Sequence, residues 1–171
     1  MKHYIIRILV CFLFLSSACK KEDSPSQSSA NIMQAKIDGR YFENKACFGC
    51  AEGGDGIGVE YDDSGYLSIT GFDRSYGNLG FIAKGVLAPG DYPLYHINGS
   101  YARVNIYEGN KVYFTSTVNS GTLHITKIDF KRKILSGTFE FTAEQDINPS
   151  NVKKVTNGVI DVTFQQRILI K

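Results

Sequence analysis

The chain has 171 residues and is nearly neutral, with 19 Lys and Arg residues against 17 Asp and Glu residues. This balance excludes the basic footprint of a nucleic-acid-binding protein and the polybasic patch that binds anionic lipid. The length suits one ordinary domain with a hydrophobic core of its own.

Residues 1–18 have the layout of a secretory signal peptide. Lys2 and Arg7 form a positive start, and Ile8–Leu15 is an apolar run of 8 residues. That run is too short to cross a bilayer, because a membrane-spanning helix needs about 20 apolar residues. Cleavage before Cys19 removes two basic residues and no acid, which leaves 17 of each sign in the mature chain.

Small residues lead up to a cysteine at the end of this signal. The stretch Ser16-Ser17-Ala18-Cys19 resembles the lipobox of bacterial lipoproteins, with Ser16 where a leucine is usual. The resemblance implies that Cys19 is the lipid attachment site and becomes the mature N-terminus. The alternative is an ordinary cleaved signal followed by an incidental cysteine.

Residues 19–30 are expected to form a lipidated, disordered tether. Lys20-Lys21-Glu22-Asp23 resembles the signal that sends Bacteroidota lipoproteins to the cell surface, and Ser24–Ser29 has no apolar residue to bury. Ten flexible residues reach about 18 Å. The expected location is the bacterial outer membrane, anchored through the N-terminal lipid and exposed at the cell surface, with the periplasmic side as the alternative.

Residues 31–171 are predicted to form one all-β domain. Short segments rich in Val, Ile, Tyr, Phe and Thr recur between Gly, Asn and Asp turns, as at Asp38-Gly39. Near the C-terminus, Phe139, Phe141 and Ala143 alternate with polar residues, and so do Ile160, Val162 and Phe164. This pattern indicates antiparallel strands with one wet face. We expect a β-sandwich of roughly nine to eleven strands, with an up-and-down or partly open barrel as the alternative.

The hairpin around residue 109 provides a candidate binding face. If apolar side chains of both strands face the core, a three-residue loop at 108–110 pairs Ile106 with Val112 and Val104 with Phe114. The outer face then carries Tyr101, Arg103, Asn105, Tyr107 and Tyr113. Tyrosines beside an arginine and an amide suit ligand stacking. The same residues also occur as ordinary cross-strand partners on a wet sheet face.

Cys47 and Cys50 are the two cysteines that remain once the signal is removed and Cys19 is lipidated. An oxidising envelope favours a disulfide between them. A redox-active pair is disfavoured because glycines, rather than a helix, follow the motif. Zinc would need two further ligands, and the mature chain has only His96 and His124. The sequence predicts no cofactor and no metal.

Four segments together resemble a family of small Bacteroidota lipoproteins of unknown function. They are "AKIDGRYF" near the mature start, then "GTLHITKIDF", "ILSGTFEFTAE" and "VTNGVIDVTF". The resemblance runs from about Ile32 to the C-terminus and is concentrated in the last fifty residues. It implies a fold and a location, and it carries no catalytic residues over to this chain.

Two classes of function fit these observations. The first is a lipid-anchored binding or accessory module without catalytic activity, with a glycan, a peptide or another envelope protein as its partner. The absence of Trp weighs against a glycan, because Trp offers the largest stacking surface. The second class is an envelope hydrolase with a site built from loops, although no catalytic sequence motif is present.

Overall fold

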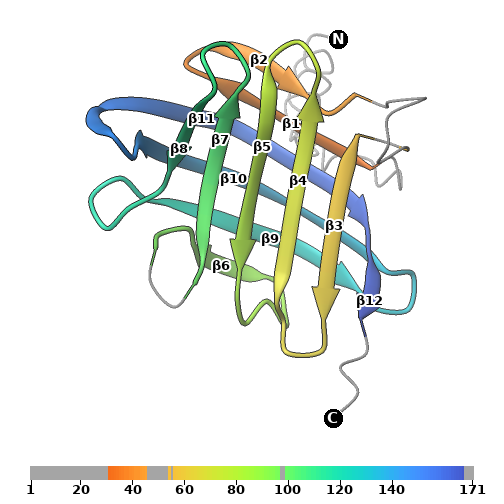
Figure 1. The fold of residues 1–171 in the computed structure, drawn as a ribbon. Coiled ribbons are helices and arrows are strands. Elements are labelled where there is room, and N and C mark those ends of the chain that lie inside the picture. Colours follow the sequence, from red (N-terminus) through yellow and green to blue (C-terminus); the bar gives the residue numbers. More distant parts are fainter. Residues whose placement is uncertain (1–30, 46–53, 55, 97–98, 168–171) are drawn as a thin grey trace, which may run out of the picture.

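The computed structural model describes residues 31–45, 54, 56–96 and 99–167, and these residues form strands and turns without a helix (Figure 1). The all-β prediction is therefore confirmed for this part of the chain. In chain order the strands are β1 (Ile32–Ile37), β2 (Arg40–Glu43), β3 (Ile57–Asp62), β4 (Leu67–Asp73), β5 (Gly77–Ala83), β6 (Gly90–Pro93), β7 (Tyr101–Ile106), β8 (Lys111–Phe114), β9 (Gly121–Asp129), β10 (Ile134–Gln145), β11 (Asn148–Thr163) and β12 (Gln165–Arg167).

All twelve strands belong to one hydrogen-bonded sheet that is not closed into a barrel. The order along the sheet is β12-β3-β4-β5-β7-β8-β10-β11-β1-β2, and β9 pairs with both β10 and β6. Every pairing is antiparallel except that of β12 with β3. In Figure 1, β3, β4, β5 and β7 lie side by side in front, while β9, β10 and β11 run behind them at a steep angle. The sheet thus folds over onto itself as the two layers of a sandwich.

The core lies between these two layers. Leu79 and Phe81 on β5 are buried, as are Phe139 and Phe141 on β10. The rings of Phe81 and Phe139 have their centroids 5.3 Å apart, so they join the front layer to the back layer. The predicted inward residues of β10 and β11, from Phe139 to Val162, are buried as expected. Burying a side chain of this size contributes about 1.5–3 kcal/mol relative to leaving it exposed.

Two tight turns connect neighbouring strands, the first of them at the predicted Asp38-Gly39 position. Asp38 and Gly39 have φ values of 49° and 83°, and Ile37 pairs with Arg40 across the turn. Both positive angles suit the two-residue turn that matches the twist of a hairpin. Between β3 and β4, Asp62 Oδ1 accepts hydrogen bonds from the backbone N–H of Ser64 at 2.8 Å and of Tyr66 at 3.2 Å. The Asp62 carboxylate accepts these hydrogen bonds in place of a backbone carbonyl, and this holds the turn in its conformation.

The predicted register of the β7–β8 hairpin is wrong by one residue. Ile106 pairs with Lys111, and Val104 pairs with Tyr113, so the loop has four residues (107–110). Tyr113 is 1% exposed and faces the core, while Phe114 lies on the outer side. Tyr113 tolerates burial because Asn151 Nδ2 donates a hydrogen bond to its hydroxyl at 3.3 Å and Lys153 Nζ lies 5.7 Å from its ring centre.

Candidate functional site

The outer face of β7 carries four of the five residues predicted as a binding face. Tyr101, Arg103, Asn105 and Tyr107 are half-buried or exposed and follow one another along the outside of the front layer. Tyr113 does not belong to this face, because it is buried on the opposite side of the sheet. The corrected face is the outer side of β7, completed by the outward residues of β8.

Tyr107 and Asn105 connect this face to the neighbouring strand β5, near the C-terminal end of β7. The Tyr107 hydroxyl donates a hydrogen bond to Asn78 Oδ1 at 2.6 Å, although the Tyr107 side chain remains 49% exposed. Asn105 pairs with Asn78 across β5 and with Val112 across β8. Its Oδ1 atom is shielded from solvent and has no hydrogen-bond partner. A buried acceptor without a partner is uncommon in folded proteins.

Three rings form an aromatic row at the other end of the face. His96 and Tyr101 stack with centroids 5.6 Å apart and planes 17° from parallel. Tyr101 then meets Phe114 edge-on at 6.0 Å. Arg103 lies directly opposite Phe114 in the β7–β8 pairing, on the same side of the sheet. The sequence pattern places Phe114 in the core and gives His96 no face, so it does not predict this row.

A hollow of about 580 Å³ lies beside the aromatic row. Its principal lining residues are His96, Phe114, Ser116, Thr117, Glu144 and Asp146. We call it the β8 hollow. Glu144 ends up here because the last residues of β10 pair with β8, with Glu144 opposite Phe114. The volume lies within the usual range of about 300–1,000 Å³ for small-ligand sites.

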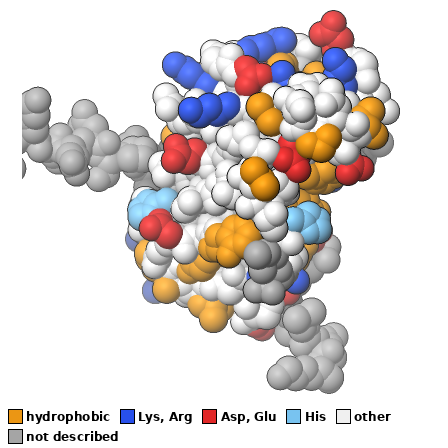
Figure 2. Space-filling view, turned by 90° about the vertical axis from the view of Figure 1, so that its left-hand side faces the viewer, with side chains coloured by type: hydrophobic (Ala, Val, Ile, Leu, Met, Phe, Trp, Pro, Cys, Tyr) orange, Lys and Arg blue, Asp and Glu red, His pale blue; other side chains and the backbone are white. Residues whose placement is uncertain are grey.

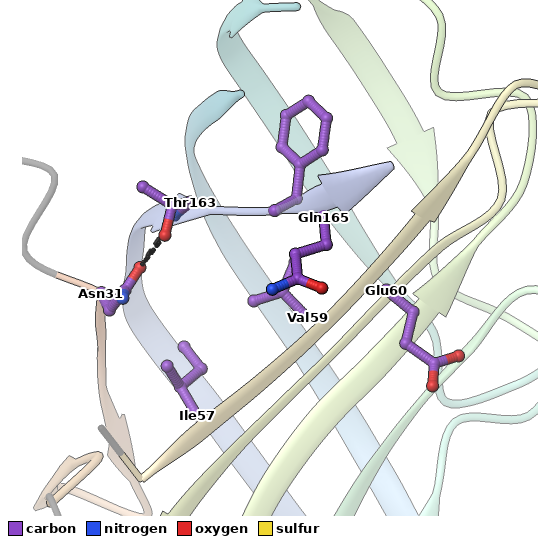
Figure 3. Close-up of a pocket in the computed structure, with 7 residues that line it drawn as sticks. Asn31, Ile57, Val59, Glu60, Thr163 and Gln165 are labelled. Carbon is purple, nitrogen blue, oxygen red and sulfur yellow. Dashed lines mark hydrogen bonds between the residues drawn. The ribbon is translucent and has the colours of Figure 1, made fainter. Parts of the chain in front are cut away.

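A second hollow, of about 360 Å³, lies at the seam where β12 meets β3 (Figure 3). Ile57 and Val59 point from β3 toward this space, whereas Glu60 points away on the other side of the strand. Asn31 Oδ1 accepts hydrogen bonds at 2.8 Å from both the N–H and the hydroxyl of Thr163. The side-chain oxygen of Asn31 therefore connects the start of β1 to the end of β11, which is a structural role.

A third hollow, of about 340 Å³, lies on the outer side of the back layer beside His124. His124 faces Asp91 across the β6–β9 pair, and His124 Nδ1 contacts Asp91 Oδ1. His124 is thus a cross-strand partner of Asp91. Both side chains are more than half exposed. In such a setting an ion pair contributes about 0–1 kcal/mol.

The Lys and Arg side chains gather at one end of the face shown in Figure 2, where acidic side chains lie among them. The mixture of both signs means that this end of the face does not form a field of one sign. Among the described residues, Lys153 Nζ lies 2.7 Å from Asp38 Oδ2, and the Arg40 guanidinium lies 4.5 Å from the centre of the Tyr76 ring.

Cys19, Cys47 and Cys50 lie outside the described residues, so lipid attachment and the disulfide remain predictions. Within the described part of the chain, no group of three or more His, Cys, Asp or Glu side chains is arranged to hold a metal ion. The same residues include no helix with the length and hydrophobicity required to cross a membrane.

These features define a small all-β domain with hollows that open to solvent along the sheet faces. The chain belongs to the family described as a domain of unknown function (DUF6252), whose model matches residues 29–162. The expectation of an uncharacterised family is confirmed. No curated protein and no solved structure matches the chain significantly.

Proposed function

We propose that this chain is a lipid-anchored lipoprotein of the bacterial envelope whose β domain is a non-catalytic binding module. The anchor is Cys19, preceded by an apolar signal and followed by a charged, serine-rich tether. The location is the outer membrane of a Bacteroidota-type envelope, with the domain displayed at the cell surface. The resemblance of Lys20-Lys21-Glu22-Asp23 to a surface-export signal supports this side of the membrane.

The observation that carries the binding function is the aromatic row next to the β8 hollow. Aromatic rings held on paired strands lose little conformational entropy when a ligand stacks on them, so they make favourable contacts. Tyr101 contacts both His96 and Phe114. Polar side chains line the same space from the segment after β8 (Ser116 and Thr117) and from the end of β10 and the turn that follows it (Glu144 and Asp146). Aromatic surface with a few converging polar groups is typical of ligand sites.

The test is affinity capture from native envelope with the mature chain immobilised through its tether. We expect a specific envelope component to be recovered by the wild-type chain and lost with Tyr101→Ala, because Tyr101 connects the other two rings. The control is Thr138→Ala, an exposed position on the back layer. Equal recovery by wild type, Tyr101→Ala and Thr138→Ala would contradict binding through this face.

A second candidate, an envelope hydrolase, rests on one specific observation. Glu144 and Asp146 line the same hollow, and glycoside hydrolysis uses a pair of carboxylates. Incubation of the wild-type chain with envelope polysaccharide distinguishes the two candidates. A binding module leaves the polymer length unchanged, whereas a hydrolase shortens it and loses this activity in Asp146→Asn.

A further inference from the structure

The β8 hollow combines a ring surface with hydrogen-bonding groups whose positions are fixed. Phe114 lines it and is held edge-on by Tyr101, which is itself stacked on His96. The hollow is therefore bounded on one side by aromatic surface that is already ordered before a ligand arrives. Ordering the contact groups in advance removes much of the entropic cost of binding.

Hydroxyl and carboxylate groups also line the hollow. Ser116 Oγ accepts hydrogen bonds from the N–H of Val118 at 3.2 Å and of Asn119 at 3.0 Å, which fixes the hydroxyl in place. Asn119 Nδ2 donates a hydrogen bond to Glu144 Oε2. One oxygen of Glu144 is thus held by the protein, and the second oxygen has acceptor capacity for a ligand.

The charges around the hollow restrict the ligand. Glu144 and Asp146 line it, whereas Arg103 is not among its described lining residues. An anionic polymer would meet two carboxylates, which disfavours its binding. The mixture of carboxylate acceptors and hydroxyl groups instead suits a ligand that is neutral and rich in hydroxyl groups.

We propose that the β8 hollow binds a neutral glycan, an inference that rests on the binding function proposed above. The apolar face of a sugar ring stacks on Phe114, and His96 lines the same hollow. Neighbouring sugar hydroxyls donate hydrogen bonds to Glu144 and Asp146, and Ser116 and Thr117 offer further hydroxyl contacts. Phe114 and His96 provide stacking area in a chain that has no Trp.

The inference is tested by titrating the mature chain with four neutral oligosaccharides, namely malto-, cello-, manno- and xylohexaose, at millimolar concentrations. Binding is followed by amide chemical shifts. We expect at least one sugar to bind, with shifts concentrated at residues 96, 101, 114 and 144. The exposed variant Asp146→Asn should weaken binding about tenfold, since a hydrogen bond to a charged group contributes about 1.5–3 kcal/mol. Phe114→Ala should weaken it by at least as much.

Glu140→Gln is the matched control, because Glu140 is an exposed carboxylate on β10 that lies outside the β8 hollow. Asp146→Asn replaces an exposed side chain, so it tests the site even if Phe114→Ala fails to fold. The inference is overturned if none of the four sugars binds, or if Asp146→Asn and Glu140→Gln bind equally well. If the sugars fail while envelope capture still depends on Tyr101, the ligand class is wrong and the binding function stands.

Discussion

Lys45 Nζ lies 2.9 Å from Asp73 Oδ2 and connects the end of β2 to the end of β4. Asp73 is 4% exposed, and its other oxygen accepts hydrogen bonds from Ser75 N at 2.8 Å and Ser75 Oγ at 2.7 Å. Burial alone would raise the pKa of Asp73. The hydrogen bonds from Ser75 and Lys45 outweigh this effect and hold the pKa below its ordinary value of 3.8.

We expect Asp73→Asn to lower the free energy of unfolding at pH 7 by about 1.5–3 kcal/mol, because hydrogen bonds to a charged acceptor are lost. A carboxyl group whose folded pKa is depressed stabilises the fold above its unfolded pKa, and this contribution disappears as the pH falls through the folded pKa. The difference in the free energy of unfolding between wild type and Asp73→Asn should therefore have its full value at neutral pH and become smaller below pH 3.8. Urea unfolding at several pH values measures it. If this difference stayed constant down to about pH 2, the conclusion that Asp73 is ionised in the folded protein at neutral pH would be wrong.

The second prediction concerns the contact between the layers. Phe81→Ala should lower the free energy of unfolding by about 3–5 kcal/mol, since it leaves a cavity opposite Phe139. Leu87→Ala is the control, because Leu87 is 55% exposed. Surface changes of this kind stay within about 0.5 kcal/mol. Similar effects of the two substitutions on urea unfolding would mean that the layers do not pack through Phe81.

The predictable parts of this fold are those that local chemistry determines. Asp38-Gly39 tolerates positive φ at both positions, so the hairpin turn follows from two residues. Phe139 and Phe141 are separated by polar residues on a wet face, so the inner side of β10 is unambiguous. In such segments the alternation of apolar and polar side chains determines which face of the strand is buried.

The β7–β8 register was not predictable in this way, because β8 carries hydrophobic or aromatic side chains on both faces. Val112 and Phe114 alternate with Tyr113, and the pattern does not reveal which set is buried. The choice of Tyr113 as the buried residue depends on Asn151 and Lys153, which reach its side chain from β11. The β8 hollow is equally non-local, since Glu144 lies opposite Phe114 only after the sheet has folded over.

The third prediction tests this corrected register. Tyr113→Ala should destabilise the domain by about 3 kcal/mol or more, because a large buried ring is removed. Tyr107→Ala should cost about 1 kcal/mol, the usual contribution of one hydrogen bond, here the one to Asn78. Thermal unfolding of the two variants compares them directly. If Tyr107→Ala destabilised the domain more than Tyr113→Ala, the three-residue loop would be the correct one and Tyr113 would lie on the outer face.

The fourth prediction is that Cys47 and Cys50 are joined in the mature protein. Without reductant, the intact mass should be lower than that of the reduced chain by two hydrogen atoms. On the chain-entropy model, so short a loop contributes only about 2 kcal/mol, so Cys47→Ser should leave the domain folded. Alkylation of two free thiols in protein isolated from the oxidising envelope would rule out the bridge.

The fifth prediction is that Cys19 alone anchors the chain to the membrane. In Cys19→Ser the acyl acceptor is lost, and a neutral mature chain has no basic patch to hold it on anionic lipid. We therefore expect the protein to move from the membrane fraction to the soluble fraction, and labelled fatty acid to be incorporated into the wild type alone. Ser17→Thr, a conservative change within the signal, is the control that should remain membrane-bound. If Cys19→Ser is still cleaved at the same place and still sediments with membranes, a different part of the chain holds it there.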